Sequence, residues 1–444
     1  MVTREYDFLK LTSFSVINNW SVIVNTAGMF NSRYNVLPLK NVLVRSKDAI
    51  QIENDIKYKR ITIKLYGMGV QLRDEIYGSE IGTKRQFIAH SGQLIISRID
   101  ARNGAFGIVP PELEGAIVTN DFWLFDVKDA SIEFLMILLS SATFQPYWQS
   151  QSSGTTNRQR VNEYDFLDTQ VPLPEKRIQE KIVVNYRGIL AEAEENEKTA
   201  LNFEKAIEQY FFDMLGIIEP NKPNDKKKFI KKCYLKDLSR WDVWNKKELY
   251  KSTKYQFIDF GSVIRGKPLY GANEKAIKTI TDVRYIRITD INEDGSLNDD
   301  FVSAINVEQK YLLQENDFLI ARSGNTVGKT FLYKSKMGKA IFAGYLIKFV
   351  LNEKRINPEY LLYYTKSKLF KSWIESNQRI FGQPNINGQE YLKAQIIVPP
   401  MEIQNKIAYY ISEQKHKIKA HHQKSKDLLE FAKKQFEEVF FGEA

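Results

Sequence analysis

Hydrophobic and small residues recur in alternating steps of four and three between Pro172 and Gly216. The repeated positions are Ile182, Tyr186, Ile189, Ala193, Asn196, Ala200, Phe203, Ile207, Tyr210 and Met214. This spacing is typical of the seam of a coiled coil and not of a helix face buried in a globular core. The pattern therefore predicts one long central helix that needs a second helix to cover its seam.

A matching pattern lies at the end of the chain, between Pro399 and Gly442. The motif Ile403-Gln404-x-Lys406-Ile407 repeats Ile178-Gln179-x-Lys181-Ile182, which lies 404 − 179 = 225 residues earlier. The C-terminal segment is therefore predicted to be a second copy of the central helix. We expect the two helices to pair in antiparallel orientation, with one globular domain at each end of the pair.

The segments that precede the two helices also repeat each other. Phe318–Arg322 matches Leu94–Arg98, and Ile341–Phe349 matches Ile117–Phe125, both at an offset of 318 − 94 = 224 residues. Solenoid repeats are only about 20 to 50 residues long, so this repeat is a duplicated domain with its helix. We predict an α+β fold in which two similar mixed α/β globular domains are separated by two long antiparallel helices, a coiled coil with internal pseudo-two-fold symmetry.

Proline positions and changes in composition set the expected boundaries. Pro172 and Pro174 end a strand and start the central helix. The predicted parts are a first domain at 1–171, the central helix at 172–216, a Pro- and Lys-rich linker at 217–232, a second domain at 233–398 and the C-terminal helix at 399–444.

The charge of the chain points to a polyanionic partner. The net charge is +10, with 64 Lys and Arg residues, which favours nucleic acid although lysine-rich surfaces are often only solvated. The single Cys233 excludes an internal disulfide framework and a thiolate-rich zinc site, and no metal site is expected. The sequence contains neither a run of about 18 apolar residues nor the apolar core of a signal peptide, so we expect a cytoplasmic protein without a membrane span.

Two similar domains related by a two-fold axis suit duplex DNA, where half-sites on one face recur about every 34 Å. The helices begin VPLPEKRIQEKI and VPPMEIQNKI, and the domains contain GQLIISRIDARNGAFGIVP and its counterpart NDFLIARSGNTVGKTFLY. In these stretches and in its two-copy organisation, the chain resembles the specificity subunits of type I restriction-modification systems over nearly its whole length.

The resemblance implies a non-catalytic DNA sequence-specificity subunit. Two target-recognition domains would each read one part of a bipartite double-stranded DNA target, and the helices would space them. Two methyltransferase (modification) subunits, followed by ATP-dependent restriction subunits, would assemble around the chain. S-adenosylmethionine, ATP and magnesium would be used by those partner subunits, and this chain would hold no cofactor.

Polar loops and strand ends supply the candidate DNA-binding residues. Arginine suits guanine, and Asn and Gln suit adenine, although any single loop residue is about as often merely solvated. Arg98 and Arg322 end apolar strands, and pairing with an internal carboxylate is the alternative for both. The candidates are Arg98, Arg102, Asn103, Thr156, Asn157, Arg158 and Arg160 in the first domain and Arg322, Asn325, Lys329, Arg379, Gln383 and Asn385 in the second.

Aromatic and leucine residues at the ends of both helices exceed what one seam can bury. We therefore expect these helix ends to dock the modification subunits. The candidate partner-binding residues are Phe203, Tyr210, Phe211, Phe436 and Phe440.

No catalytic set stands out in the sequence. Ser323–Thr330 resembles a nucleotide-binding loop, but three residues instead of four separate its glycine from Gly328-Lys329, and a strand-like segment follows. Two alternatives to a recognition subunit stay open. One is a methyltransferase or nuclease fused to its own recognition domain, and the other is a coiled-coil scaffold that does not bind DNA.

Overall fold

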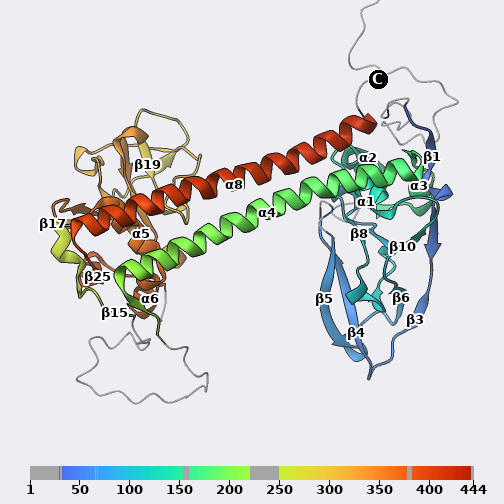
Figure 1. Ribbon diagram of the computed structural model, residues 1–444, viewed down its shortest axis with the longest axis horizontal. Coiled ribbons are helices and arrows are strands. Elements are labelled where there is room, and N and C mark those ends of the chain that lie inside the picture. The colour runs from blue at the N-terminus through green and yellow to red at the C-terminus, as the bar shows by residue number, and fades with distance from the viewer. Residues whose placement is uncertain are drawn as a thin grey trace, which may run out of the picture. The chain divides into compact units, whose positions relative to one another are not determined.

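The computed structural model describes residues 30, 33–65, 67, 69–153, 160–220, 250–377 and 383–441. The chain divides into two units, Met1–Glu197 with Gln423–Ala444 (unit 1) and Lys198–His422 (unit 2). Each unit contains one domain of strands and short helices together with one half of each long helix (Figure 1). Most of the predicted linker at 217–232 lies outside the described residues.

Unit 1 contains two sheets that share its core. An antiparallel sheet has the order β2-β10-β7-β8, and a second sheet has the order β3-β6-β9-β4-β5. Only β4 and β9 pair in parallel among the strands of these sheets. The strands are β2 (Leu43–Ser46), β10 (Phe122–Val127), β7 (Leu94–Ser97), β8 (Phe106–Ile108), β3 (Ala49–Gln51), β6 (Arg85–Ala89), β9 (Ala116–Val118), β4 (Lys57–Ile63) and β5 (Val70–Tyr77).

Unit 2 repeats the first of these sheets with the order β17-β24-β21-β22. A parallel pair, β19 and β23, stands where unit 1 has β4 and β9. The second sheet is smaller than in unit 1, because β19–β23 and β18–β20 are separate two-stranded sheets. The strands are β17 (Ile264–Tyr270), β24 (Leu346–Leu351), β21 (Phe318–Ala321), β22 (Thr330–Leu332), β19 (Arg284–Ile286), β23 (Ala340–Phe342), β18 (Ala276–Ile277) and β20 (Ser303–Ala304).

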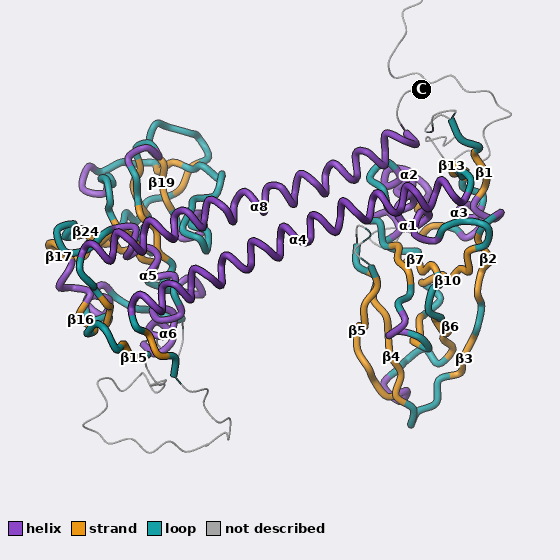
Figure 2. The backbone as a smooth tube through the Cα atoms, viewed as in Figure 1, coloured by secondary structure: helices purple, strands orange, loops and turns teal. Residues whose placement is uncertain are grey.

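Short strand pairs and helices follow the same order in both units (Figure 2). Unit 1 has β1 (Val36–Pro38) with β13 (Gln170–Pro172), β11 (Ser152–Ser153) with β12 (Arg160–Val161), α1 (Ile132–Ser140), α2 (Phe144–Gln151) and α3 (Glu163–Leu167). Unit 2 has β16 (Phe257–Asp259) with β25 (Gln395–Ile397), β14 (Ile217–Ile218) with β15 (Lys251–Ser252), α5 (Pro358–Lys366), α6 (Lys368–Asn377) and α7 (Gly388–Leu392). This shared order is the structural form of the repeat seen in the sequence.

The long helices are α4 (Lys176–Leu215) and α8 (Met401–Phe441), and they pair in antiparallel orientation within each unit. In unit 1 the Asn185 side chain donates to Gln435 at 2.8 Å, and Glu192 pairs with Lys424 at 2.8 Å. In unit 2 the ring of Tyr210 stacks on Tyr410, with their centroids 3.8 Å apart. None of the described helices is long and apolar enough to span a membrane.

The ends of the long helices complete the domain cores, which corrects the expected docking role of three aromatic residues. Phe436 and Phe440 are buried in the core of unit 1, where both contact the ring of Phe134 on α1. Phe211 is buried in the core of unit 2 against Tyr360 and Tyr364 of α5. Their side chains are covered by this chain itself, so the expectation that they dock partner subunits is wrong.

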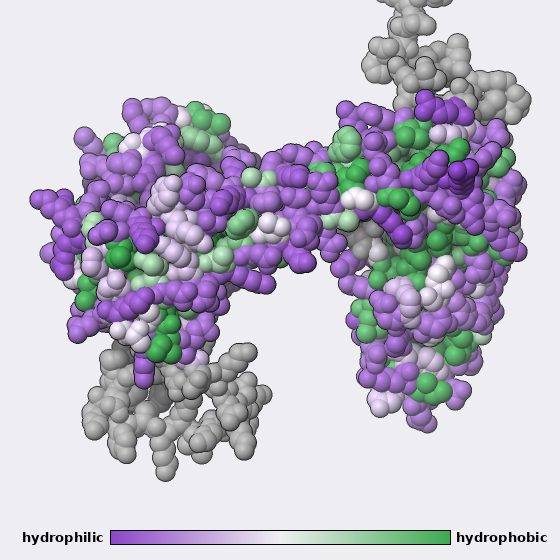
Figure 3. Space-filling model, viewed as in Figure 1, coloured by the Kyte–Doolittle hydropathy of each residue, from purple (hydrophilic) through white to green (hydrophobic). Residues whose placement is uncertain are grey.

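Phe203 and Tyr210 lie half-buried in the helix seam. Phe203 contacts the ring of His421 at 5.7 Å, and Tyr210 contacts Tyr410, so α8 covers both. The exposed face of the two units is mostly hydrophilic in the view of Figure 3, with separate hydrophobic areas. Exposed apolar residues of α4 and α8 include Val184, Leu201, Tyr409, Leu429 and Phe431.

Candidate nucleic-acid interface

An arginine follows the same central strand in each unit. Arg98 follows β7, and its main-chain N–H donates to the carbonyl of Asp121 at 2.9 Å. Arg322 follows β21, and its N–H donates to the carbonyl of Tyr345 at 3.0 Å. These two contacts lie at the repeat offset, so the folded chain places both arginines in one equivalent position.

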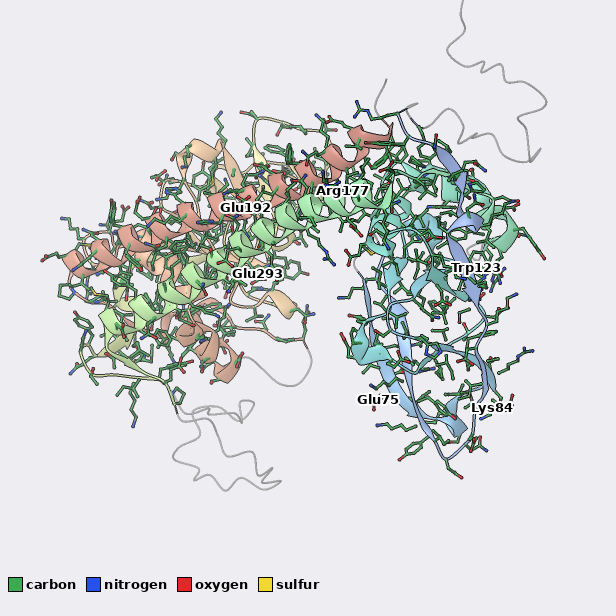
Figure 4. All side chains as sticks on the ribbon, turned by 45° about the vertical axis from the view of Figure 1, so that its right-hand side comes forward. Glu75, Lys84, Trp123, Arg177, Glu192 and Glu293 are labelled. Atoms are coloured by element: carbon green, nitrogen blue, oxygen red, sulfur yellow. The ribbon has the colours of Figure 1, made fainter. Side chains whose placement is uncertain are left out.

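Both guanidinium groups lie over an aromatic ring. Arg98 is 5.1 Å from the ring centroid of Trp123, and Arg322 is 5.1 Å from that of Tyr270. Within the described residues the Nε atom of each arginine is buried without a hydrogen-bond partner. The ring stacking is therefore what holds these side chains, and not the internal carboxylate that was the alternative. Trp123 lies in the sheet region of unit 1, away from Glu75 and Lys84 at its far end (Figure 4).

The predicted polar loops meet these strand ends. The N–H of Val161 donates to the carbonyl of Arg98 at 3.2 Å, and the N–H of Ile386 donates to that of Arg322 at 2.9 Å. In unit 2 a further bridge joins Ser323 to Asn385. Two groups of candidates that are far apart in the sequence therefore form one surface in each unit.

Arg160 anchors the base of the first polar loop. Its guanidinium forms a two-point hydrogen bond with the Asp121 carboxylate, at 2.8 and 3.2 Å. The hydrogen bond to Asp121 raises the pKa of Arg160 and keeps its charge. Because Asp121 occupies one edge of the guanidinium, Arg160 orients the loop in this structure.

The other candidates fall into three groups. Arg102 and Asn103 are half-buried in a turn that contacts α2, and Lys329 is half-buried and pairs with Glu293 at 3.2 Å. Asn325 and Gln383 are exposed and Asn385 is half-buried. Thr156, Asn157, Arg158 and Arg379 lie outside the described residues.

The sequence interpretation missed two residues of this surface. Asp121 and Tyr345 occupy equivalent positions, since 345 − 121 = 224 residues, and the Tyr345 side chain is 56% exposed beside Arg322. The repeat alignment of Ile117–Phe125 with Ile341–Phe349 contained this signal, because the two residues are unlike while their neighbours are similar. A position that differs on a shared framework is where two readers are expected to diverge.

The surface offers stacked arginines, amides and an exposed tyrosine, which are groups suited to hydrogen bonding and stacking with DNA. No group of three or more metal-ligating side chains is found among the residues that the structure describes. The fold and the site together define a protein with two copies of one α+β recognition domain.

The chain belongs to the family described as the type I restriction modification DNA specificity domain, whose family model matches residues 31–201 and 242–430. The predicted family and fold class are therefore confirmed. At the level of the family, so is the prediction of a DNA-specificity subunit and not an enzyme.

The relatives include the type I restriction enzyme MjaVIII specificity subunit of Methanocaldococcus jannaschii. It is 30% identical over 113 residues, which is 26% of this chain and a quarter (25%) of that protein. A solved structure reported under complex assembly and conformational transition of the type I R-M system has a TM-score of 0.60 at 15% identity, covering 92% of this chain and 97% of the other. The HsdS subunit from Thermoanaerobacter tengcongensis gives a TM-score of 0.44 at 16% identity, covering 93% and 98%.

Proposed function

We propose that this chain is the DNA sequence-specificity subunit of a type I restriction-modification complex, and that each unit reads one part of a bipartite target. The observation that carries the proposal is a shared framework with unlike surface residues. Unit 1 presents Arg98 with the Arg160–Asp121 pair, whereas unit 2 presents Arg322 with Tyr345 and Gln383. Different side chains on one framework are what the recognition of two different half-sites requires.

The proposed partners are methyltransferase subunits and ATP-dependent restriction subunits. The relatives are specificity subunits, and the solved structure of similar fold is reported in the context of complex assembly of a type I system. Two methyltransferase subunits are proposed because the long-helix element occurs in two copies, α4 and α8. In such a complex S-adenosylmethionine, ATP and magnesium would be bound by the partner subunits.

Mapping of methylated adenines tests the function directly. The chain is expressed with its neighbouring methyltransferase gene in a host that lacks methylation, and genomic adenine methylation is mapped by sequencing. We expect a motif with two short specified parts separated by a gap of fixed length. A single continuous motif would refute the two-reader proposal, and methylation without this chain would refute its role in specificity.

Replacement of Gln383 and Asn385 by Ala supplies the matched control. Because both residues belong to unit 2, we expect the double variant to relax one part of the motif and to leave the other part unchanged. Relaxation of both parts together would show that the units do not read independently.

A further inference from the structure

A basic cavity lies in unit 2 beside the turn that follows β21. Its volume is about 230 Å³, several times the roughly 30 Å³ that a water molecule occupies in the liquid. Lys329, Lys366 and Lys371 line it, and Phe370 and Ile374 of α6 form an apolar part of the wall. The cavity therefore combines lysines with a surface that keeps water away from one side of them.

The charges around Lys366 leave room for another anion. Burial, with Lys415 and Lys371 nearby, lowers the pKa of Lys366 to about 8, and Asp294 and Glu293 only partly compensate. The Lys366 ammonium donates to the main-chain carbonyl of Glu293 at 2.9 Å. A lysine that is harder to protonate than usual is one whose charge is not fully balanced in the folded protein.

The carboxylates that face the cavity are weakly held. Glu293, labelled in Figure 4, pairs with Lys329 at 3.2 Å, but its side chain is 84% exposed. Exposed pairs of this kind contribute about 1 kcal/mol or less. Glu375 also lines the cavity. A phosphate group, which carries more charge-accepting oxygens than one carboxylate, can therefore displace Glu293 from Lys329.

The cavity adjoins the surface that carries the candidate base-reading residues. The turn Gly324–Thr326 separates the two, and its exposed Asn325 lines the cavity. On the other side the N–H of Gly324 donates to the carbonyl of Pro384 at 2.9 Å. A Cβ atom at Gly324, where φ is +72°, would lie 3.2 Å from the Gln383 amide nitrogen, so Gln383 packs directly on this turn.

We propose that this cavity binds a backbone phosphate of the DNA strand whose bases are read by Gln383 and Asn385. The proposal rests on the proposed function and adds a phosphate site to it. Proteins use phosphate contacts to fix their register on the duplex, and base contacts to specify sequence. The site belongs to unit 2, because Ala105 stands at the repeat position of Lys329, and α1 ends in Ser140 where α5 ends in Lys366.

The salt dependence of DNA binding tests the phosphate site in the full chain assembled with its methyltransferase partner. For Lys371→Gln we expect weaker binding to the mapped duplex, an unchanged methylation motif and a slope of log K against log salt reduced by about one. Lys368→Gln is the control on the same helix, since Lys368 pairs with Glu208 on α4, and its slope should equal that of the parent. Glu293→Gln should tighten binding, because it frees Lys329.

A second measurement follows Lys366 itself. Lysines are labelled by reductive ¹³C-methylation, and the Lys366 signal, assigned with Lys366→Met, is titrated with and without DNA or inorganic phosphate. We expect the titration midpoint to rise from about 8 when either is present. A complex that binds its mapped target while the Lys371→Gln slope and the Lys366 midpoint stay unchanged would overturn the phosphate site alone. A complex that binds no duplex DNA would overturn the proposed function as well.

Discussion

The side-chain oxygen of Gln179 accepts a hydrogen bond from the main-chain N–H of Ser131 at 2.8 Å. Gln404 makes the same contact in unit 2, where its oxygen accepts from the N–H of Asn357 at 2.7 Å. Ser131 and Asn357 are the N-cap residues of α1 and α5. One buried glutamine at the start of each long helix therefore fixes that helix to the first helix of its domain.

Replacement of these glutamines should destabilise the protein. In Gln179→Leu the N–H of Ser131 loses its acceptor and the carbonyl of Pro174, which accepts from the Gln179 amide at 2.7 Å, loses its donor. Buried polar groups left without partners cost about 1–3 kcal/mol each, so we expect a loss of at least that size in the free energy of unfolding, measured by urea denaturation. Gln404→Leu should behave alike, whereas exposed Gln423→Leu should change the value by less than about 0.5 kcal/mol. Equal effects at buried and exposed sites would contradict the assigned role.

The buried aromatic ends of the helices lead to a second prediction. Phe440→Ala and Phe211→Ala should each lower the free energy of unfolding by about 3–5 kcal/mol, because each removes a fully packed ring from a domain core. Phe431→Ala is the control, since this ring on α8 is 53% exposed. Loss of partner binding with unchanged unfolding free energy would restore the docking role that the structure takes away from these residues.

The repeat and the seam made the architecture predictable. A spacing of four and three residues is a property of the helix alone, so α4 and α8 could be located without knowledge of their surroundings. The same spacing says nothing of a third element, and the packing of Phe440 on Phe134 of α1 could not be seen in it. The surplus of aromatic residues was noticed correctly, but it was assigned to another protein instead of to the chain's own domain.

The stacked arginines show a similar limit. Arg98 and Arg322 were recognisable as equivalent because the strands before them repeat. Their partners were not, because Trp123 and Tyr270 lie on opposite sides of them in sequence and the repeat does not relate one ring to the other. The alignment could identify a shared position, and only the folded sheets could identify which side chain lies against it.

The pair at the base of the first polar loop leads to a third prediction. Asp121→Asn removes the charge that orients Arg160, and the pair is partly exposed, so little stability should be lost. We expect the part of the DNA motif read by unit 1 to become degenerate, by about 1–3 kcal/mol of lost discrimination, while the part read by unit 2 is kept. Tyr345→Ala should have the converse effect, and methylation mapping measures both. If the two variants altered the same part of the motif, the assignment of one part to each unit would be wrong.

The lowered pKa of Lys366 gives a prediction for the dependence of stability on pH. Burial moves this pKa from 10.5 to about 8, so between these values the unfolded chain binds the proton and the folded chain does not. Stability must then rise with pH across this window, and below pH 8 the folded protein bears the full cost of the buried charge. Lys366→Met keeps an unbranched side chain without the charge, so the variant should be more stable than the parent at pH 7, and the difference should shrink towards pH 10. Urea denaturation at both pH values measures the difference, in which the other titrating groups cancel, with exposed Lys354→Met as the control. A difference that stays constant with pH would mean that Lys366 is fully balanced by its neighbours, and the case for an anion at this cavity would lose its electrostatic support.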